Sequence, residues 1–333
     1  MSPISADRLD PALVARFRAD LAQLCDPDAA RILVAVSGGG DSLALLLLAH
    51  AALGDRCHAA TVDHRIRPEA ADEAAGVGRL CAARGIDHHV LADDLPARAG
   101  RTANVSARAR ALRYRLLEAH ATAIGADRLA TAHHADDQLE TLVMRLNRGA
   151  GLAGLAGIRA AGGMIIRPLL GWRRAELAAL LAGCGIVAID DPSNVSDRYD
   201  RARLRKALVG TDWLDVGRVA ASARALGEAE DALAWATREA ERRHCDGPDA
   251  RGPVTLYPAG LPVEIRRRLV VTCLTRVDDA LDLRGPEIAR LIAALAGGGA
   301  ATLGEVLARA TTRLRYGVET PAWVFVKAPA RRS

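Results

Sequence analysis

Ile32-Leu33-Val34-Ala35-Val36-Ser37-Gly38-Gly39-Gly40-Asp41-Ser42 leads directly into the apolar run Leu43 to Leu48. Five consecutive apolar residues at 32–36 are typical of a parallel strand that is covered on both faces. Three glycines then allow the backbone to approach a ligand at a distance that a Cβ atom would prevent. The stretch therefore predicts a buried strand, a ligand-binding turn and a helix, which is the unit from which parallel α/β sheets are built.

The turn has the features of an anion site. Its backbone N–H groups and the N-terminus of the next helix, which we expect to open at Asp41 or Ser42, would converge on phosphate oxygens. Asp41 adds a negative charge, and a carboxylate beside phosphates is favourable when Mg²⁺ bridges them. The loop thus predicts a site for a nucleoside triphosphate with Mg²⁺, and an ordinary glycine turn is the alternative.

The common phosphate-binding motif GxxxxGK[ST] is absent, and the chain has only two lysines, Lys206 and Lys327. The hexapeptide Ser37-Gly38-Gly39-Gly40-Asp41-Ser42 instead resembles the SGGxDS loop of the PP-loop ATP pyrophosphatases. That resemblance implies a site in which all six residues bind ATP. It also implies cleavage of ATP between the α and β phosphates, and an adenylated intermediate.

The composition is that of an ordinary globular protein of 333 residues, with 50% hydrophobic and 26% charged side chains, long enough for two domains. The net charge of +5 favours an anionic partner, although a genome-wide bias toward arginine is an alternative explanation. Six scattered cysteines form no CxxC pair, so we expect free thiols, a cytoplasmic location and no structural zinc. No segment has the pattern of a signal peptide or a membrane span.

Apolar periodicity predicts strands at residues 32–36, 57–62, 88–91 and 128–132, and helices at residues 7–24, 70–84, 103–125 and 135–148. This alternation predicts a doubly wound parallel sheet over residues 1–212. A smaller, mainly helical domain is expected at residues 213–333. It would begin with a long helix from Trp213 to about Cys245, followed by helices at 261–277 and 285–296 and strand-like segments at 312–316 and 323–326.

Polar residues follow two of the predicted strands, and ligands of such sheets bind at the carboxyl ends of the strands. Asp63 and His64 follow the second strand, and the run from Thr131 to Thr141 follows the fourth. In the helix after the fourth strand, helical spacing turns the leucines and valine at 139, 142, 143 and 146 toward the core and the acids at 136, 137 and 140 away from it.

Three acids within five residues repel one another unless a cation lies among them. Candidates are Mg²⁺ and the ammonium group of a substrate, and a solvated acidic helix start is the alternative. His133 and His134 are adjacent on an extended segment, so both cannot point inward and at least one is expected to face the ligand.

Several further blocks resemble the tRNA(Ile)-lysidine synthetases, a family of PP-loop enzymes. They are Asp63-His64-Arg65-Ile66-Arg67, Asn104 to Tyr114, Ala132 to Thr141, Met144-Arg145-Leu146, Arg148 to Gly151, Arg167-Pro168-Leu169-Leu170 and Asp191-Pro192-Ser193-Asn194 with the arginines at 201, 203 and 205. The likeness covers about residues 31–210. Arg65 and Pro68-Glu69 depart from the family pattern, so the contacts of that loop do not carry over.

The resemblance implies a reaction in two steps. ATP adenylates the wobble cytidine of tRNA(Ile) with a CAU anticodon, and the amine of free L-lysine then displaces AMP to give lysidine. It implies ATP and Mg²⁺ as cofactors, Asp41 and Asp137 as metal ligands, and Asp63, His64 and Arg148 as nucleotide contacts. Asp137 and Glu140 would hold an ammonium or accept the proton of the attacking amine, with His133 as a competing base.

Two arginine-rich regions are candidates for RNA contact. The cluster at residues 198–206 suits phosphate or carboxylate, and the run 266–268 with Arg309, Arg313 and Arg315 suits the backbone of tRNA. Rival functions are another PP-loop enzyme, such as a tRNA cytidine thiolase or an amide-forming NAD or GMP synthetase, and a catalytically inactive RNA-binding module. A thiolase would be expected to show a cysteine pair, which the sequence lacks.

Overall fold

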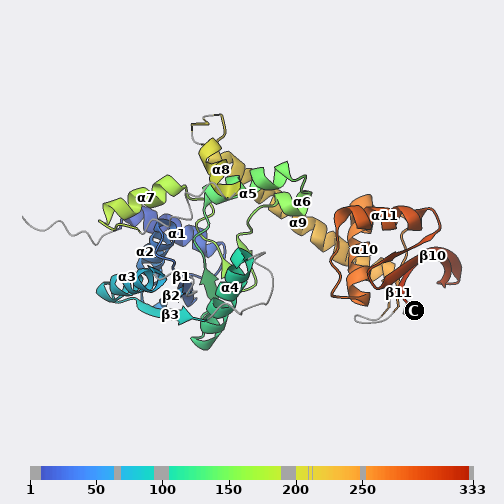
Figure 1. The fold of residues 1–333 in the computed structure, drawn as a ribbon, viewed down its shortest axis with the longest axis horizontal. Coiled ribbons are helices and arrows are strands. Elements are labelled where there is room, and N and C mark those ends of the chain that lie inside the picture. Colours follow the sequence, from blue (N-terminus) through green and yellow to red (C-terminus); the bar gives the residue numbers. More distant parts are fainter. Residues whose placement is uncertain are drawn as a thin grey trace, which may run out of the picture. The chain divides into compact units, whose positions relative to one another are not determined.

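The computed structural model describes residues 9–63, 69–93, 105–188, 200–208, 210–211, 213–247 and 253–329 (Figure 1). The chain divides into two compact units, Met1–Gly227 and Glu228–Ser333. The division falls within helix α9 (Val216–His244), whereas the sequence predicts a boundary near residue 212. Among the described residues, no helix is both long enough and apolar enough to cross a membrane.

The first unit contains a six-stranded sheet in the order β3-β2-β1-β4-β6-β5. Its strands are β1 (Ile32–Ala35), β2 (Cys57–Asp63), β3 (Asp87–Ala92), β4 (Arg128–Ala130), β5 (Ala161–Gly162) and β6 (Ile165–Ile166). All neighbouring pairs are parallel except β5 with β6 at the edge. The predicted parallel sheet is confirmed. The two-residue strands β5 and β6 were not predicted, because they are too short to show a periodicity.

Helices cover both faces of this sheet. One face is covered by α1 (Pro11–Ala22), α2 (Gly40–Leu53), α3 (Glu69–Ala83) and α7 (Arg174–Gly183), and the other by α4 (Val105–Ala123). The unit also contains the 3-10 turn η1 (Gly54–Arg56) after α2 and the helices α5 (Ala135–Asn147), α6 (Leu152–Leu155) and α8 (Asp200–Leu208). Successive side chains of β1 point to opposite faces: Val34 packs with α1, α2 and α7, and Leu33 packs with α4. Because each face has a helical cover, the strand is apolar throughout, as predicted.

The strand order places a crevice beside β1. From β1 the chain moves outward to β2 and β3, and it then returns to β4 on the other side of β1. The connections that leave the carboxyl ends of β1 and β4 therefore diverge to opposite sides. In open α/β sheets ligands bind at such a reversal, so the glycine loop after β1 and the segment after β4 form the expected site.

The second unit contains a five-stranded antiparallel sheet in the order β7-β8-β11-β10-β9, together with the rest of α9. Its other elements are β7 (Cys245–Asp246), β8 (Val254–Leu256), α10 (Val263–Val277), α11 (Gly285–Ala296), β9 (Ala300–Leu303), β10 (Val306–Arg315) and β11 (Val318–Lys327). Leu269 of α10 and Leu291 of α11 share a core with Trp323 and Phe325 of β11. The predicted helices are present, and the sheet is larger than the two strand-like segments expected.

Candidate active site

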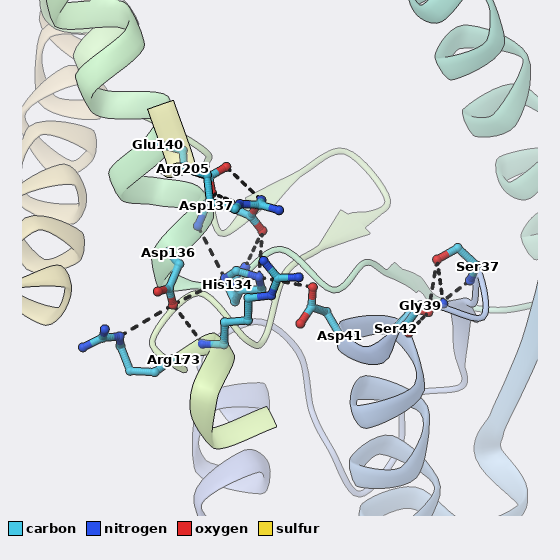
Figure 2. Close-up of polar contacts among 11 residues, drawn as sticks. Ser37, Gly39, Asp41, Ser42, His134, Asp136, Asp137, Glu140, Arg173 and Arg205 are labelled. Atoms are coloured by element: carbon cyan, nitrogen blue, oxygen red, sulfur yellow. Dashed lines mark hydrogen bonds and ion pairs between the residues drawn. The ribbon is translucent and has the colours of Figure 1, made fainter. Parts of the chain in front are cut away.

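The glycine loop after β1 is held by its own residues. The backbone N–H of Ser37 donates to the Ser42 hydroxyl at 3.1 Å, and that hydroxyl donates to the carbonyl of Gly39 at 2.8 Å (Figure 2). Gly38 has φ 84°, a left-handed conformation that favours glycine. An added Cβ at Gly39 or Gly40 would meet protein atoms only at 3.5 Å, an ordinary contact. The protein itself therefore leaves room for side chains at these two positions, and the close approach of a ligand is a reason for glycine there.

Helix α2 begins at Gly40, with Gly39 as its N-cap and no side-chain hydrogen bond at the cap. The prediction that Asp41 or Ser42 opens the helix is wrong, because the Ser42 hydroxyl is used inside the loop. The first turn of α2 thus has backbone N–H groups that no side chain caps, and its dipole favours an anion. Asp41 lies in that same turn.

His134 lies between two carboxylates that come from different connections of the sheet. Its Nε2 atom is 3.3 Å from the Asp41 carboxylate and 3.6 Å from that of Asp137 (Figure 2). The His134 ring is buried, whereas the Asp41 side chain keeps 36% of its exposure. The loop after β1 and the start of α5 therefore meet at a single imidazole.

The same histidine caps helix α5. Its Nδ1 accepts from the backbone N–H of Asp137 at 3.4 Å, and the Asp137 carboxylate accepts from the backbone N–H of His134 at 3.1 Å. This reciprocal capping box satisfies N–H groups that an uncapped helix would leave without partners. The orientation of His134 is thus determined by the local backbone as well as by Asp41.

The two groups shift each other's ionisation. Burial acts to lower the pKa of His134, but the hydrogen bond with Asp41 and the charges of Asp137, Asp41 and Asp136 outweigh it, and the pKa is raised. Burial acts to raise the pKa of Asp41, but the hydrogen bond with His134 and its charge outweigh that effect, and the pKa is lowered. Both shifts reflect the hydrogen bond in which the Nε2–H of His134 is directed at the Asp41 carboxylate, while Nδ1, which accepts the N–H of Asp137 in the cap, carries no proton.

Glu140 is buried and bound to an arginine of α8. Arg205 donates from Nε to one carboxylate oxygen at 2.7 Å and from Nη2 to the other at 3.2 Å. The Glu140 hydrogen bond is the largest cause of the raised pKa of Arg205. The prediction that Glu140 faces away from the core and Leu146 faces toward it is wrong, because Glu140 is 4% exposed and Leu146 is 62% exposed. The charge of Arg205 allows the carboxylate to be buried, which a periodicity argument does not consider.

A pocket of about 250 Å³ lies on the same side of α5. It is lined by the polar residues Asp136, Glu140, Arg173, Arg174, Arg205 and Thr211 and by the apolar residues Leu139, Leu208, Leu214 and Val216. The Asp136 carboxylate accepts from the backbone N–H of Arg174 at 2.8 Å, and Arg173 Nε lies 3.6 Å from it (Figure 2). The pocket thus presents both signs of charge beside an apolar wall.

The remaining predicted site residues lie in different places. His133 hydrogen-bonds through Nδ1 to the Thr131 hydroxyl at 3.1 Å, one step from His134. Asp63 is the last residue of β2, and His64 lies outside the described residues. Arg148 caps the C-terminus of α5, about 16 Å from Asp137 along the helix axis at 1.5 Å per residue. The role of Arg148 as a nucleotide contact stays a prediction.

Sequence reasoning missed the central position of His134 and the part of Arg173 and Arg174 in the pocket. The His134-x-x-Asp137 spacing matches the reciprocal N-terminal cap, so a search for capping boxes that includes histidine would have found His134. Arg205 was in a cluster predicted to contact phosphate or carboxylate, and the carboxylate it contacts is Glu140. For Arg173 and Arg174 the sequence has no comparable signal, because their pocket is formed by tertiary packing.

This arrangement suits chemistry on an anionic ligand. Uncapped N–H groups, two carboxylates that approach one imidazole, and a pocket with charges of both signs lie at the reversal of strand order. In the described part of the chain no group of three or more His, Cys, Asp or Glu residues could hold a metal ion by itself. A metal here would take two protein carboxylates at most, with its other ligands from substrate or water.

Comparison with known proteins gives consistent results. Residues 13–211 match the PP-loop domain family. The chain is 46% identical over 327 residues to a tRNA(Ile)-lysidine synthase of Novosphingobium aromaticivorans. The match covers 96% of this chain and 94% of the relative. It is also 38% identical over 320 residues to a tRNA(Ile)-lysidine synthase of Zymomonas mobilis, and this match covers 93% of this chain and 92% of the relative.

Among solved structures, the U34-tRNA thiolase NcsA from Methanococcus maripaludis, with its [4Fe-4S] cluster, superimposes with a TM-score of 0.54. The sequence identity is 18%, and the match covers 65% of this chain and 78% of that chain. At this identity the likeness concerns the fold alone.

Proposed function

The chain belongs to the tRNA(Ile)-lysidine synthase family of PP-loop enzymes, and from that premise we propose that it ligates free L-lysine to the wobble cytidine of tRNA(Ile) with a CAU anticodon. The ligation consumes ATP through an adenylated cytidine and releases AMP and pyrophosphate. The observation that carries the proposal is the contact of His134 with Asp41, which brings the PP-loop and the acidic start of α5 into one site. The reaction belongs in the cytoplasm, where tRNA and ATP meet.

The PP-loop domain implies the use of ATP. In our proposal the N–H groups of residues 38–42 bind the phosphates, and the Ser37 and Ser42 hydroxyls, 3.2 Å apart, keep the loop in shape. Adenylation requires phosphates held in line with the attacking oxygen, and fixed backbone donors supply both position and charge stabilisation. Asp63, His64 and Arg148 are further proposed contacts of the nucleotide.

The donor set fits Mg²⁺. Asp41 and Asp137 offer hard oxygen ligands on either side of His134, and Mg²⁺ in nucleotide sites takes one or two carboxylates together with substrate phosphates. When bound, the ion neutralises the charge that develops on pyrophosphate. His134 positions both carboxylates, because it touches each of them and is itself oriented by the cap of α5.

Lysine binding is proposed for the pocket beside α5. A free amino acid with an ammonium, a carboxylate and an apolar stem is matched by Asp136, by the guanidinium groups of Arg173 and Arg174, and by the apolar wall. The attacking amine must lose its proton before it can act as a nucleophile. Asp137 and His133 are the candidate bases. Glu140, with both oxygens on Arg205, is suited to fixing that arginine unless the pair opens to receive the ammonium.

The experiment that tests the proposal uses the full chain with ATP, Mg²⁺, labelled lysine and unmodified tRNA(Ile) carrying a CAU anticodon. We expect label in the anticodon nucleotide after nuclease digestion, with AMP and pyrophosphate in equal amounts. A transcript whose wobble cytidine is replaced by uridine is the matched control and should stay unlabelled. Formation of ADP as the main product, or equal labelling of both transcripts, would contradict the proposal.

A further inference from the structure

The hairpin of β10 and β11 extends beyond its neighbours in the sheet of the second unit. The two strands pair from Val306 opposite Lys327 to Arg315 opposite Val318. Strand β9 pairs with β10 only as far as Arg309, and β8 pairs with β11 only from Trp323 onward. In the described part of this sheet, residues 310–322 therefore form a two-stranded ribbon that no third strand supports.

The turn at the end of this ribbon has an unusual residue. Tyr316 and Gly317 both have positive φ, 49° and 80°, as a two-residue type I′ turn requires. Asparagine followed by glycine is the favoured pair in such turns, and a tyrosine in the left-handed region is strained. Tyr316 is 93% exposed, and within the described residues the Arg315 guanidinium lies 5.2 Å from the centre of its ring, so little packing offsets that strain. A strained residue that is almost fully exposed points to a contact outside the chain.

The residues beside the turn are apolar and exposed as well. Leu314 is 73% exposed and Val318 is 65% exposed, so together with Tyr316 three large side chains at the tip face solvent. A small apolar tip on a protruding ribbon is suited to contact with a flat, weakly polar surface, such as the face of a nucleobase.

Cationic side chains lie along one face of β10. Arg309, Arg313 and Arg315 alternate along β10 and so point to the same side. Arg315 is occupied, because it stacks on Tyr257 at 4.0 Å and donates to the carbonyl of Arg243. Arg309 and Arg313 are exposed, and neither has an ion pair with another residue that the structure describes. Arg313 on the ribbon and Arg309 just before it are thus available to phosphate.

The other predicted RNA-binding run is engaged inside the unit. Arg268 donates to both oxygens of Glu230 at 2.7 Å, and Arg267 donates to both oxygens of Glu264 at 2.7 Å. Two of the three arginines at 266–268 therefore have their charge balanced by carboxylates. Available positive charge is instead found on the ribbon, next to the exposed aromatic ring.

We propose that the tip of the β10–β11 hairpin is an RNA-contacting element, in which Tyr316 stacks on an unpaired base of the bound tRNA and Arg313 contacts a neighbouring phosphate. The inference rests on the proposed function, since tRNA is the substrate that supplies the RNA. It adds a positioning residue far along the chain from the PP-loop. Stacking contributes to affinity with little sequence preference, whereas the phosphate contact makes binding depend on salt.

The test measures binding of full-length protein to unmodified tRNA(Ile) across a series of salt concentrations. Tyr316→Asn removes the ring and places a favoured residue in the turn, so we expect unchanged or higher thermal stability and a Kd raised at least about fivefold. Tyr316→Phe should bind like the parent. Arg313→Ala should flatten the slope of log Kd against log salt by about 0.7 to 0.9. Arg267→Ala, which removes a paired arginine, is the matched control and should leave the slope unchanged.

Equal tRNA affinity of Tyr316→Asn and the parent, with lysidine still formed by both, would overturn the hairpin proposal and leave the proposed function intact. A parent protein that neither binds nor modifies tRNA would instead remove the proposed function, and this inference with it. A change of oligomeric state in Tyr316→Asn, measured by light scattering without a change in tRNA affinity, would assign the tip to a protein contact and overturn the RNA role.

Discussion

His134 Nε2 lies 3.3 Å from the carboxylate of Asp41, so one imidazole joins the connection after β4 to the loop after β1. The contact couples the stability of helix α5 to the geometry of the PP-loop, because His134 is also the N-cap of α5. His134 therefore has a structural role, as the cap of α5, and a role in the site, through its contact with Asp41. Substitutions that remove one role and keep the other can measure each separately.

Substitutions of His134 should separate its capping of α5 from its contact with Asp41. His134→Ala removes the cap and is expected to lower the free energy of unfolding by about 1 to 2 kcal/mol. His134→Asn keeps a capping side chain and should recover most of that loss, yet it cannot reach Asp41 in the same way. Urea unfolding and tRNA-dependent pyrophosphate release measure the two effects. We expect both variants to have low activity, and an Asn variant as active as the parent would show that capping is the whole role.

The Glu140–Arg205 pair is expected to stabilise the first unit. Arg205→Ala leaves a buried carboxylate without its partner, which should cost about 2 to 3 kcal/mol, less than for a fully buried pair because Arg205 is 30% exposed. Glu140→Gln keeps the shape and one acceptor, so its cost should be smaller. A double-mutant cycle with Glu140→Gln and Arg205→Met measures the coupling free energy. Additive effects would mean that the observed bidentate contact contributes nothing to stability.

The two steps of the proposed reaction should respond differently to the acids. Asp41→Ala is expected to abolish tRNA-dependent pyrophosphate release, since Asp41 lies in the first turn of α2 beside the proposed phosphate site. Asp137→Ala and Glu140→Ala are expected to keep part of that release and to block transfer of lysine. Pyrophosphate release assayed with and without lysine distinguishes the steps. Equal loss of release in all three variants would contradict separate roles.

The pH dependence of stability should report on Glu264. Hydrogen bonds from Arg267 and then Arg268 lower the pKa of Glu264 to about 2 from 4.5. Because the folded pKa is depressed, the stabilisation is complete above pH 4.5 and is lost as the pH falls through about 2. Glu264→Gln should therefore be less stable than the parent at pH 7, by roughly 1 kcal/mol once the 40% exposure of this side chain is allowed for.

Chemical unfolding of the parent and Glu264→Gln between pH 7 and pH 2 measures this dependence, and the two curves should converge at low pH. Glu287→Gln, which removes one carboxylate from the first turn of α11, is the control substitution. A difference in the free energy of unfolding between the parent and Glu264→Gln that grows as the pH falls would contradict this prediction.

The parallel sheet was predictable because its signal is local. A run such as 32–36 is apolar throughout, and Ser37 to Ser42 carries a motif that determines both turn and ligand. The short strands β5 and β6 were not predictable, since two residues show no period. Strand β9, with its small residues at 300–302, likewise depends on pairing with β10 rather than on its own propensity.

Part of the candidate site was likewise predictable from local sequence, and part was not. Asp41 and Asp137 stand in motifs beside strand ends, so the sequence predicts that they meet at the crevice. The burial of Glu140 depends on Arg205, which lies 65 residues further along the chain. No window of local sequence contains both members of that pair, and a carboxylate without its partner is expected at the surface. Contacts of this kind follow from the fold and cannot be inferred before it.

The hydrogen bonds among Ser37, Gly39 and Ser42 have a consequence for the thermodynamics of nucleotide binding. They order the loop in the free protein, so its conformational entropy is lost during folding and need not be lost again when ATP arrives. Calorimetry should therefore find a smaller entropic penalty for the parent than for Ser42→Ala, which cannot close the loop. The serines of this motif would then act as preorganising groups, and their removal would weaken ATP binding through entropy even where no contact with the nucleotide is lost.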